Sequence, residues 1–115
     1  MAIARERLAA AQGTLAAGVP DAAISLAYCA MLNAARAALS ERDLHARTHG
    51  GTWAEFHQQF VEPGTIDRSL VARAREAEKR RHLTDYEAAR FSRDQAEASV
   101  ADADALIAAV SGALQ

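Results

Sequence analysis

Residues 45–56, HARTHGGTWAEF, bring histidine, arginine and glycine together in one short stretch of the chain. An imidazole changes charge near neutral pH, so His49 can take a proton from an RNA 2'-hydroxyl or return one to a leaving oxygen. Such a reaction needs no metal, but it needs a cation to stabilise the charge that grows on the phosphate. Arg42 and Arg47 lie close to His49 in the sequence. We therefore take His49, Arg42 and Arg47 as candidate catalytic residues for RNA cleavage.

Gly50 and Gly51 follow His49 directly, and the helix expected after them offers a second way to hold a phosphate. Thr52 and Glu55 fit a capping box, which places the start of that helix at Thr52. The first amides of a helix have no partner within the helix and lie at the positive end of its dipole. Gly50 and Gly51 are therefore candidate substrate-binding residues, although the capping box competes for these amides. The alternative is that His49 and the glycines only shape a tight start to the helix.

A second basic cluster lies in RAREAEKRRHLTDY, residues 73–86, where cationic side chains outnumber acidic ones. Such a cluster can bind phosphate groups, and Arg80 and Arg81 are the candidate substrate-binding residues within it. The alternative is a solvated helix surface with local ion pairs. Arg36 is a separate case, because a guanidinium on an apolar helix needs a partner or a route to solvent. Asp85 is its expected partner.

Metal binding is the less favoured interpretation of the histidines. His45 and His49 are four residues apart, a spacing that on a helix would place two imidazoles side by side. The two glycines that follow argue against a helix there, and no third ligand is evident apart from His57. We therefore expect no metal and no cofactor. The one cysteine, Cys29, cannot form an internal disulfide, which fits a reducing compartment.

The composition predicts a single all-α domain over residues 1–115. The chain is 50% hydrophobic yet only 5% aromatic, and its richness in alanine favours closely packed helices without a sheet. A net charge of -2 excludes the strongly basic footprint of a general duplex-DNA binder. The apolar stretch 22–39 carries Asn33 and Arg36, so we expect a buried helix and no membrane span. No export signal is evident, and the expected location is the cytoplasm.

Hydrophobic periodicity and helix-stop signals divide the chain into about five helices of an antiparallel bundle. Gly18 and Pro20 separate the first two helices, and Pro63 ends the third. Ser92 and Gln95 fit a capping box at the start of the last helix. The second helix is apolar on several faces and is expected to be central. The expected helices are 2–17, 20–42, a short one that begins at Thr52, 67–90, and one that opens at Ser92.

Several sequence elements follow one another in a recognisable order. They are an AYxAM stretch (residues 27–31) that runs into Ala35, Arg36 and Leu39; the segment Arg47-Thr48-His49-Gly50-Gly51; Phe56 with Phe60-Val61; and Arg81 ahead of Asp85-Tyr86. Together they resemble the stand-alone bacterial and archaeal branch of the HEPN domain family. The resemblance covers nearly the whole chain, and its specificity comes from the order and separation of the elements.

The resemblance implies a helical bundle, commonly a homodimer, and often a toxin whose antitoxin is a small nucleotidyltransferase-like protein. Many HEPN proteins are metal-independent endoribonucleases that use an arginine followed, after roughly four to six residues, by a histidine. Arg42 with His49 fits the outer limit of that spacing, as does Arg75 with His82. By analogy with antitoxins that add nucleotides to a toxin tyrosine, Tyr86 is a candidate for modification. The resemblance also allows an inactive module that binds a nucleotide or a nucleotidyltransferase partner in place of cleaving RNA.

Overall fold

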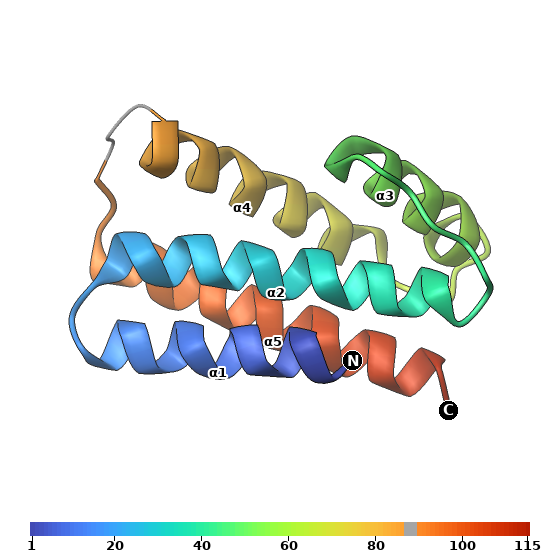
Figure 1. The fold of residues 1–115 in the computed structure, drawn as a ribbon, viewed down its shortest axis with the longest axis horizontal. Helices are drawn as coiled ribbons and strands as arrows, with labels where there is room; N and C mark the ends of the chain where they lie inside the picture. The colour runs from blue at the N-terminus through green and yellow to red at the C-terminus, as the bar shows by residue number, and fades with distance from the viewer. Residues whose placement is uncertain (87–89) are drawn as a thin grey trace.

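The computed structural model describes residues 1–86 and 90–115, and these residues form helices and connecting segments without a strand. The predicted all-α bundle is therefore confirmed. Its helices are α1 (Ala2–Ala16), α2 (Pro20–Ser40), α3 (His49–Phe56), the π-helical segment η1 (His57–Val61), α4 (Arg68–Tyr86) and α5 (Arg93–Ala113). Figure 1 shows α1, α2 and α5 running alongside one another, with α4 and the short α3 on the other side of α2.

α2 is the central helix, as its apolar faces predict, because it packs against α1, α3, α4 and α5. Small side chains on several of its faces let the neighbouring helices approach closely. The fully buried alanines of α2 are Ala23, Ala27, Ala30, Ala34, Ala35 and Ala38. By length and composition alone α2 is the one described helix that passes as a membrane-span candidate, and 61% of its most apolar window is buried inside the molecule. That burial is typical of a core helix.

Aromatic rings attach α3 and η1 to the bundle. Trp53 and Phe56 meet edge to face with their ring centroids 6.0 Å apart, and Phe56 stacks on Phe60 at 5.1 Å. All three side chains are at most 2% exposed. Because buried aromatic side chains contribute large apolar areas, this short cluster holds the start of α3 in a fixed position against α2.

The start of α3 differs from the prediction. Thr48, and not Thr52, is the N-cap residue, and its hydroxyl accepts a hydrogen bond from the Gly51 amide across 2.9 Å. Thr52 is fully buried, and its own hydroxyl donates to the Thr48 carbonyl. The predicted capping box of Thr52 and Glu55 is therefore wrong. Both threonines have suitable chemistry for a cap, and the burial of Thr52 against the bundle decides between them.

Two further helix ends differ in detail from the prediction. α2 ends at Ser40, before the expected residue 42, and Asp43 in the following turn has a positive φ of 56°. A short polar side chain tolerates this left-handed conformation, which directs the chain away from the helix axis. The described part of α4 extends to Tyr86, and Arg90, the expected last residue, is not helical; residues 87–89 of the predicted helix lie outside the described ranges.

The capping box at the start of α5 is confirmed. The Gln95 amide donates to the Ser92 hydroxyl across 3.2 Å, and the Ser92 amide donates to the Gln95 side chain across 2.8 Å. At the start of α4, Asp67 accepts a hydrogen bond from the Ser69 amide, and this bond lowers the pKa of the Asp67 carboxyl. Both starts follow from a polar side chain that satisfies amides which the helix itself leaves without partners.

Candidate functional site

His49 is the first residue of α3, so its position follows from the way this helix starts. The cap at Thr48 requires the Gly51 amide to approach the threonine hydroxyl closely. A methyl group at Gly51 would lie 2.9 Å from the Thr48 hydroxyl oxygen, whereas a methyl group at Gly50 would meet open space. Gly51 therefore serves the local backbone geometry that presents His49.

A hydrogen-bond network centred on Tyr28 lies next to His49. The Tyr28 hydroxyl donates to Glu78 Oε2 across 2.8 Å and accepts a hydrogen bond from Trp53 Nε1 across 3.1 Å. The same oxygen lies 3.3 Å from His49 Nδ1. Burial raises the pKa of Tyr28 to about 12; the bond from Trp53 opposes this rise, and Glu78 adds to it. The phenol therefore stays protonated through neutral and mildly alkaline pH.

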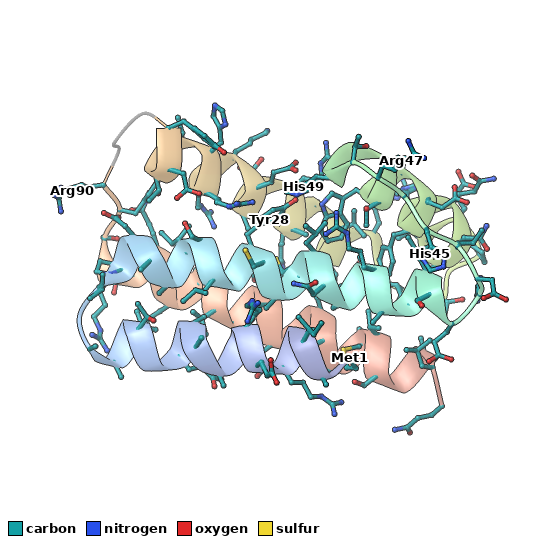
Figure 2. All side chains as sticks on the ribbon, in the orientation of Figure 1. Met1, Tyr28, His45, Arg47, His49 and Arg90 are labelled. Atoms are coloured by element: carbon teal, nitrogen blue, oxygen red, sulfur yellow. The ribbon has the colours of Figure 1, made fainter. Side chains whose placement is uncertain are left out.

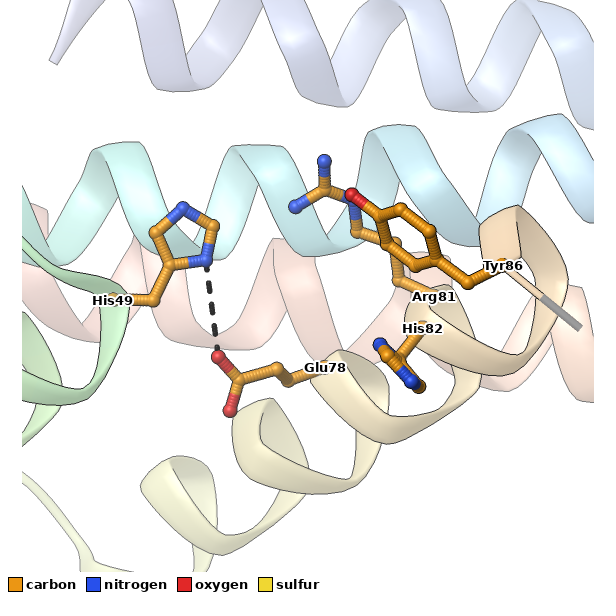
Figure 3. Close-up of a pocket in the computed structure, with 5 residues that line it drawn as sticks. All are labelled: His49, Glu78, Arg81, His82 and Tyr86. Carbon is orange, nitrogen blue, oxygen red and sulfur yellow. Dashed lines mark ion pairs between the residues drawn. The ribbon is translucent and has the colours of Figure 1, made fainter.

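The imidazole of His49 opens onto a cleft between α3 and α4. The residues that line this cleft, called the His49 cleft below, are His49, Glu78, Arg81, His82 and Tyr86, and its volume is about 170 Å³. Figure 3 shows His49 Nδ1 directed at Glu78 from the opposite wall, with 3.8 Å between Nδ1 and Oε2. The His49 side chain is 42% exposed, so a ligand can reach the ring.

Arg81 supplies the guanidinium of the His49 cleft. Its Nε donates to Asp85 across 3.1 Å, and its guanidinium carbon lies 5.6 Å from the centre of the Tyr28 ring. Asp85 also accepts a hydrogen bond from the Ser25 hydroxyl across 2.9 Å, which ties the end of α4 to α2. A carboxylate and an aromatic face thus hold Arg81 in place, and a rigidly held cation is better suited to bind a phosphate.

The predicted pairing of Arg36 with Asp85 is wrong. Asp85 contacts Ser25, which lies about three turns before Arg36 on α2, or about 16 Å along the helix axis. Arg36 lines a different cavity, between α1 and α2, together with Asn33 and His45. Arg36 is only partly buried, which fits the alternative that a long charged side chain on an apolar helix has a route to solvent.

Of the predicted arginines, only Arg81 reaches the His49 cleft. Arg42 donates to the backbone and side chain of Gln59, and its guanidinium lies 4.2 Å from the centre of the Phe60 ring. Arg80 donates to the buried hydroxyl of Ser99 on α5. Arg47 precedes the α3 cap and is exposed, without a hydrogen bond or ion pair to the described residues. Chain proximity to His49 therefore did not identify the guanidinium that shares its cleft.

The second predicted pair, Arg75 and His82, is also separated. Arg75 forms an ion pair with Glu78 at 3.4 Å and lines a shallow hollow beside Trp53. His82 lies in the His49 cleft, where its ring meets Tyr86 with 5.0 Å between centroids. Tyr86 is 74% exposed. Two imidazoles, His49 and His82, therefore face one cleft from different helices.

Sequence reasoning missed two members of the site. In the sequence, Tyr28 is part of the AYxAM stretch of an apolar helix, and Glu78 is an acidic residue within the basic cluster of residues 73–86. The structure joins them beneath His49. One signal existed in the sequence, since Glu78 lies among arginines on the same helix as Arg81 and His82. Nothing in the spacing indicated that the Tyr28 hydroxyl points to that helix.

His45 and His49 do not converge. Figure 2 shows His49 beside Tyr28 and places His45 well away from both. His45 lines the cavity between α1 and α2, whereas His49 lines the cleft at α4. Over residues 1–86 and 90–115, no group of three or more histidine, cysteine, aspartate or glutamate side chains is arranged to hold a metal ion.

Comparison with known proteins gives one finding. The sequence pattern of the HEPN domain family matches residues 1–113 of the 115-residue chain. No curated protein matched the chain. The match spans all the helices and every residue of the His49 cleft. The resemblance to the HEPN domain family that was inferred from the ordered sequence elements is therefore confirmed.

Proposed function

The chain belongs to the HEPN domain family, and we propose that it is a metal-independent endoribonuclease that acts as the toxin of a toxin–antitoxin pair. The observation that carries the proposal is that the accessible imidazole of His49 shares one cleft with the guanidinium of Arg81. In RNA cleavage the ribose 2'-hydroxyl attacks the adjacent phosphate. This reaction requires a group that carries the proton and a fixed cation that stabilises the phosphate charge.

In the proposed reaction, Nε2 of His49 removes the proton from a ribose 2'-hydroxyl, and the 2'-oxygen bonds to the adjacent phosphorus. The bond between phosphorus and the 5'-oxygen of the next nucleotide breaks, and a protonated imidazole returns a proton to that oxygen. His82 lines the same cleft and is the proposed proton donor. The products are a 2',3'-cyclic phosphate and a 5'-hydroxyl, so atoms and charge balance without a metal.

Arg81 is the proposed ligand of the phosphate. Its Nε–H is engaged by Asp85, whereas its terminal NH₂ groups form no hydrogen bond with the described residues and can donate to phosphate oxygens. This role replaces the one predicted for Arg42, whose guanidinium contacts Gln59 and Phe60. Arg47, two residues before His49 and exposed, is the proposed contact to a flanking phosphate.

The proposed partners follow from the family. We expect a homodimer and a nucleotidyltransferase-like antitoxin. Tyr86, 74% exposed at the edge of the His49 cleft, is accessible to such an enzyme. A nucleotide attached to its hydroxyl would place a bulky phosphate group beside Arg81 and block RNA. This arrangement would let an antitoxin silence the toxin by covalent modification.

A second candidate function is an inactive HEPN module that binds a nucleotide or a nucleotidyltransferase partner. One observation favours it: the carboxylate of Glu78 lines the same cleft, and a negative charge there opposes the approach of an RNA phosphate. The cleft volume of about 170 Å³ suits one phosphate group better than a whole nucleotide, so within this alternative a nucleotidyltransferase is favoured over a nucleotide as the binding partner. Under this reading His49 only fixes the start of α3.

Cleavage of single-stranded RNA in the presence of EDTA separates the two functions. The expected result is cutting by the wild-type protein, with 2',3'-cyclic phosphate ends, and arrest of growth when the chain is expressed without a partner. His49→Gln should abolish both effects without lowering the melting temperature. His45→Gln is the matched control, because His45 is exposed and lies outside the cleft.

Two outcomes would count against the nuclease. Undiminished cutting by His49→Gln would remove His49 from the reaction and leave His82 as the imidazole to test. A wild-type protein that cuts no RNA, yet forms a stable complex with a nucleotidyltransferase, would instead support the binding module.

A further inference from the structure

The hydroxyl of Tyr28 has three polar neighbours but only one proton to donate. Glu78 receives that proton, because its carboxylate is the strongest acceptor present and lies nearest, at 2.8 Å. Trp53 Nε1 carries a hydrogen and can only donate, so the Tyr28 oxygen accepts from it. A hydroxyl oxygen can accept two hydrogen bonds. The remaining lone pair of Tyr28 therefore faces Nδ1 of His49 at 3.3 Å.

We infer that Tyr28 and Glu78 hold neutral His49 in the tautomer that carries its hydrogen on Nδ1, which leaves the lone pair of Nε2 available to the cleft. A bare Nδ1 would place its lone pair against the lone pair of the Tyr28 oxygen, which is repulsive. Glu78 Oε2 lies 3.8 Å from Nδ1 and also favours the Nδ1–H tautomer, because a carboxylate attracts a hydrogen on the atom that faces it.

The orientation of the His49 ring determines which nitrogen can act as a base in this tautomer. Figure 3 shows the second ring nitrogen on the side of His49 that faces away from Glu78. With the hydrogen on Nδ1, Nε2 is the atom that can accept a proton. A free neutral imidazole in water prefers the opposite tautomer, with its hydrogen on Nε2, so the protein has to impose this one. Tyr28 is suited to this, since it is fully buried and keeps its own proton.

The use of Nε2 as a base rests on the proposed nuclease function, whereas the tautomer itself does not. Tyr28 and Glu78 are positioning residues in this scheme, because they act on the substrate only through His49. The orienting role resembles that of any hydrogen-bond partner that fixes which nitrogen of a histidine is protonated.

The tautomer can be measured without RNA. A long-range ¹H–¹⁵N correlation spectrum of the ¹⁵N-labelled protein at about pH 9, where an unperturbed imidazole is neutral, distinguishes a protonated ring nitrogen from a bare one. We expect His49 to show its hydrogen on Nδ1. His45, which is exposed and has no hydrogen bond to the described residues, is the internal reference and should show the hydrogen on Nε2.

Two variants test whether Tyr28 and Glu78 are the cause of the Nδ1–H tautomer. Glu78→Gln lets the Tyr28 proton turn toward His49, and Tyr28→Phe removes the acceptor at Nδ1. Each should shift the His49 tautomer ratio toward Nε2–H by about fivefold, the factor expected for loss of one ordinary hydrogen bond. The matched control is Glu76→Gln, which removes a carboxylate from the same helix but from an exposed pair with Lys79. This control should leave the His49 ratio unchanged.

The wild-type spectrum decides the inference even if a variant fails to fold. A His49 ring with its hydrogen on Nε2, or an even mixture of the two forms, overturns it. If His49 carries its hydrogen on Nδ1 but the protein cuts no RNA, the proposed nuclease function is wrong and the tautomer assignment still holds. If the protein does cut RNA, Glu78→Gln should lower kcat by up to about fivefold with little change in KM, because only the chemical step uses Nε2 and a fivefold shift in the tautomer ratio lowers the share of the Nδ1–H form by at most that factor.

Discussion

The hydroxyl of Tyr28 on α2 donates a hydrogen bond to Glu78 on α4 across 2.8 Å, although the two residues are 50 positions apart in the sequence. Trp53 on α3 donates to the same hydroxyl. One buried oxygen therefore joins three helices directly beneath the His49 cleft. Because a buried polar group without a partner is costly, these three side chains fix one another, and the walls of the cleft with them.

Stability should fall in alkaline solution because of Tyr28. Its pKa is raised from 10.0 to about 12 in the folded chain, so between these values the unfolded chain releases the proton first. The contribution is fully present below about pH 10 and is lost as the pH rises toward 12. Urea unfolding at several pH values should show this decline, and Tyr28→Phe should lack it. An identical decline in Tyr28→Phe would assign the effect to another group.

The two glycines at the start of α3 should respond differently to alanine. Gly51→Ala brings a methyl group to 2.9 Å from the Thr48 hydroxyl, so it should weaken the cap and destabilise the fold by about 1 kcal/mol or more. Gly50→Ala meets no atom and should be neutral or slightly stabilising, since alanine favours a helix. Thermal unfolding of both variants checks this. Equal effects would mean that Thr48 does not cap the helix as described.

Asp85 and Arg36 should contribute to stability independently. Asp85→Ala breaks the contacts with Arg81 and Ser25, so the free energy of unfolding should fall by about 0.5–1 kcal/mol. Arg36→Met should change it by less than about 0.5 kcal/mol, because Arg36 forms no ion pair with the described residues. Asp104→Ala, an exposed position on α5, is the control for loss of a charge. A coupling between Asp85 and Arg36 in a double-mutant cycle would contradict the separation seen here.

If the protein cleaves RNA, Arg81 and Arg42 should differ sharply in activity. Arg81→Gln removes the guanidinium from the His49 cleft, and kcat should fall by about 100-fold or more. Arg42→Gln should leave kcat within about twofold and affect only the contacts with Gln59 and Phe60. Single-turnover cleavage of a labelled RNA measures both. The opposite order of effects would restore the pairing of Arg42 with His49 that the sequence spacing suggests.

Local sequence signals determined most of the fold. Gly18 adopts a positive φ of 80° where the first helix was expected to stop, and Pro20 begins α2. Ser92 and Gln95 form the predicted cap of α5. These features depend on residues a few positions apart, whose steric and hydrogen-bonding preferences do not require a long-range contact. The ordered elements of the sequence likewise led to the HEPN family, which matches residues 1–113.

Only the tertiary structure decided the composition of the cleft. Thr48 and Thr52 have the same capping chemistry. Because Thr52 is buried against the bundle, Thr48 is the residue that caps α3. The sequence predicts that His49 is a proton carrier and pairs it with an arginine near it in the chain. Helix packing instead brings Arg81 to His49, and Tyr28 beneath it. Which side chains meet across helices depends on the rotation and offset of whole packed elements, and a spacing along one chain does not contain that information.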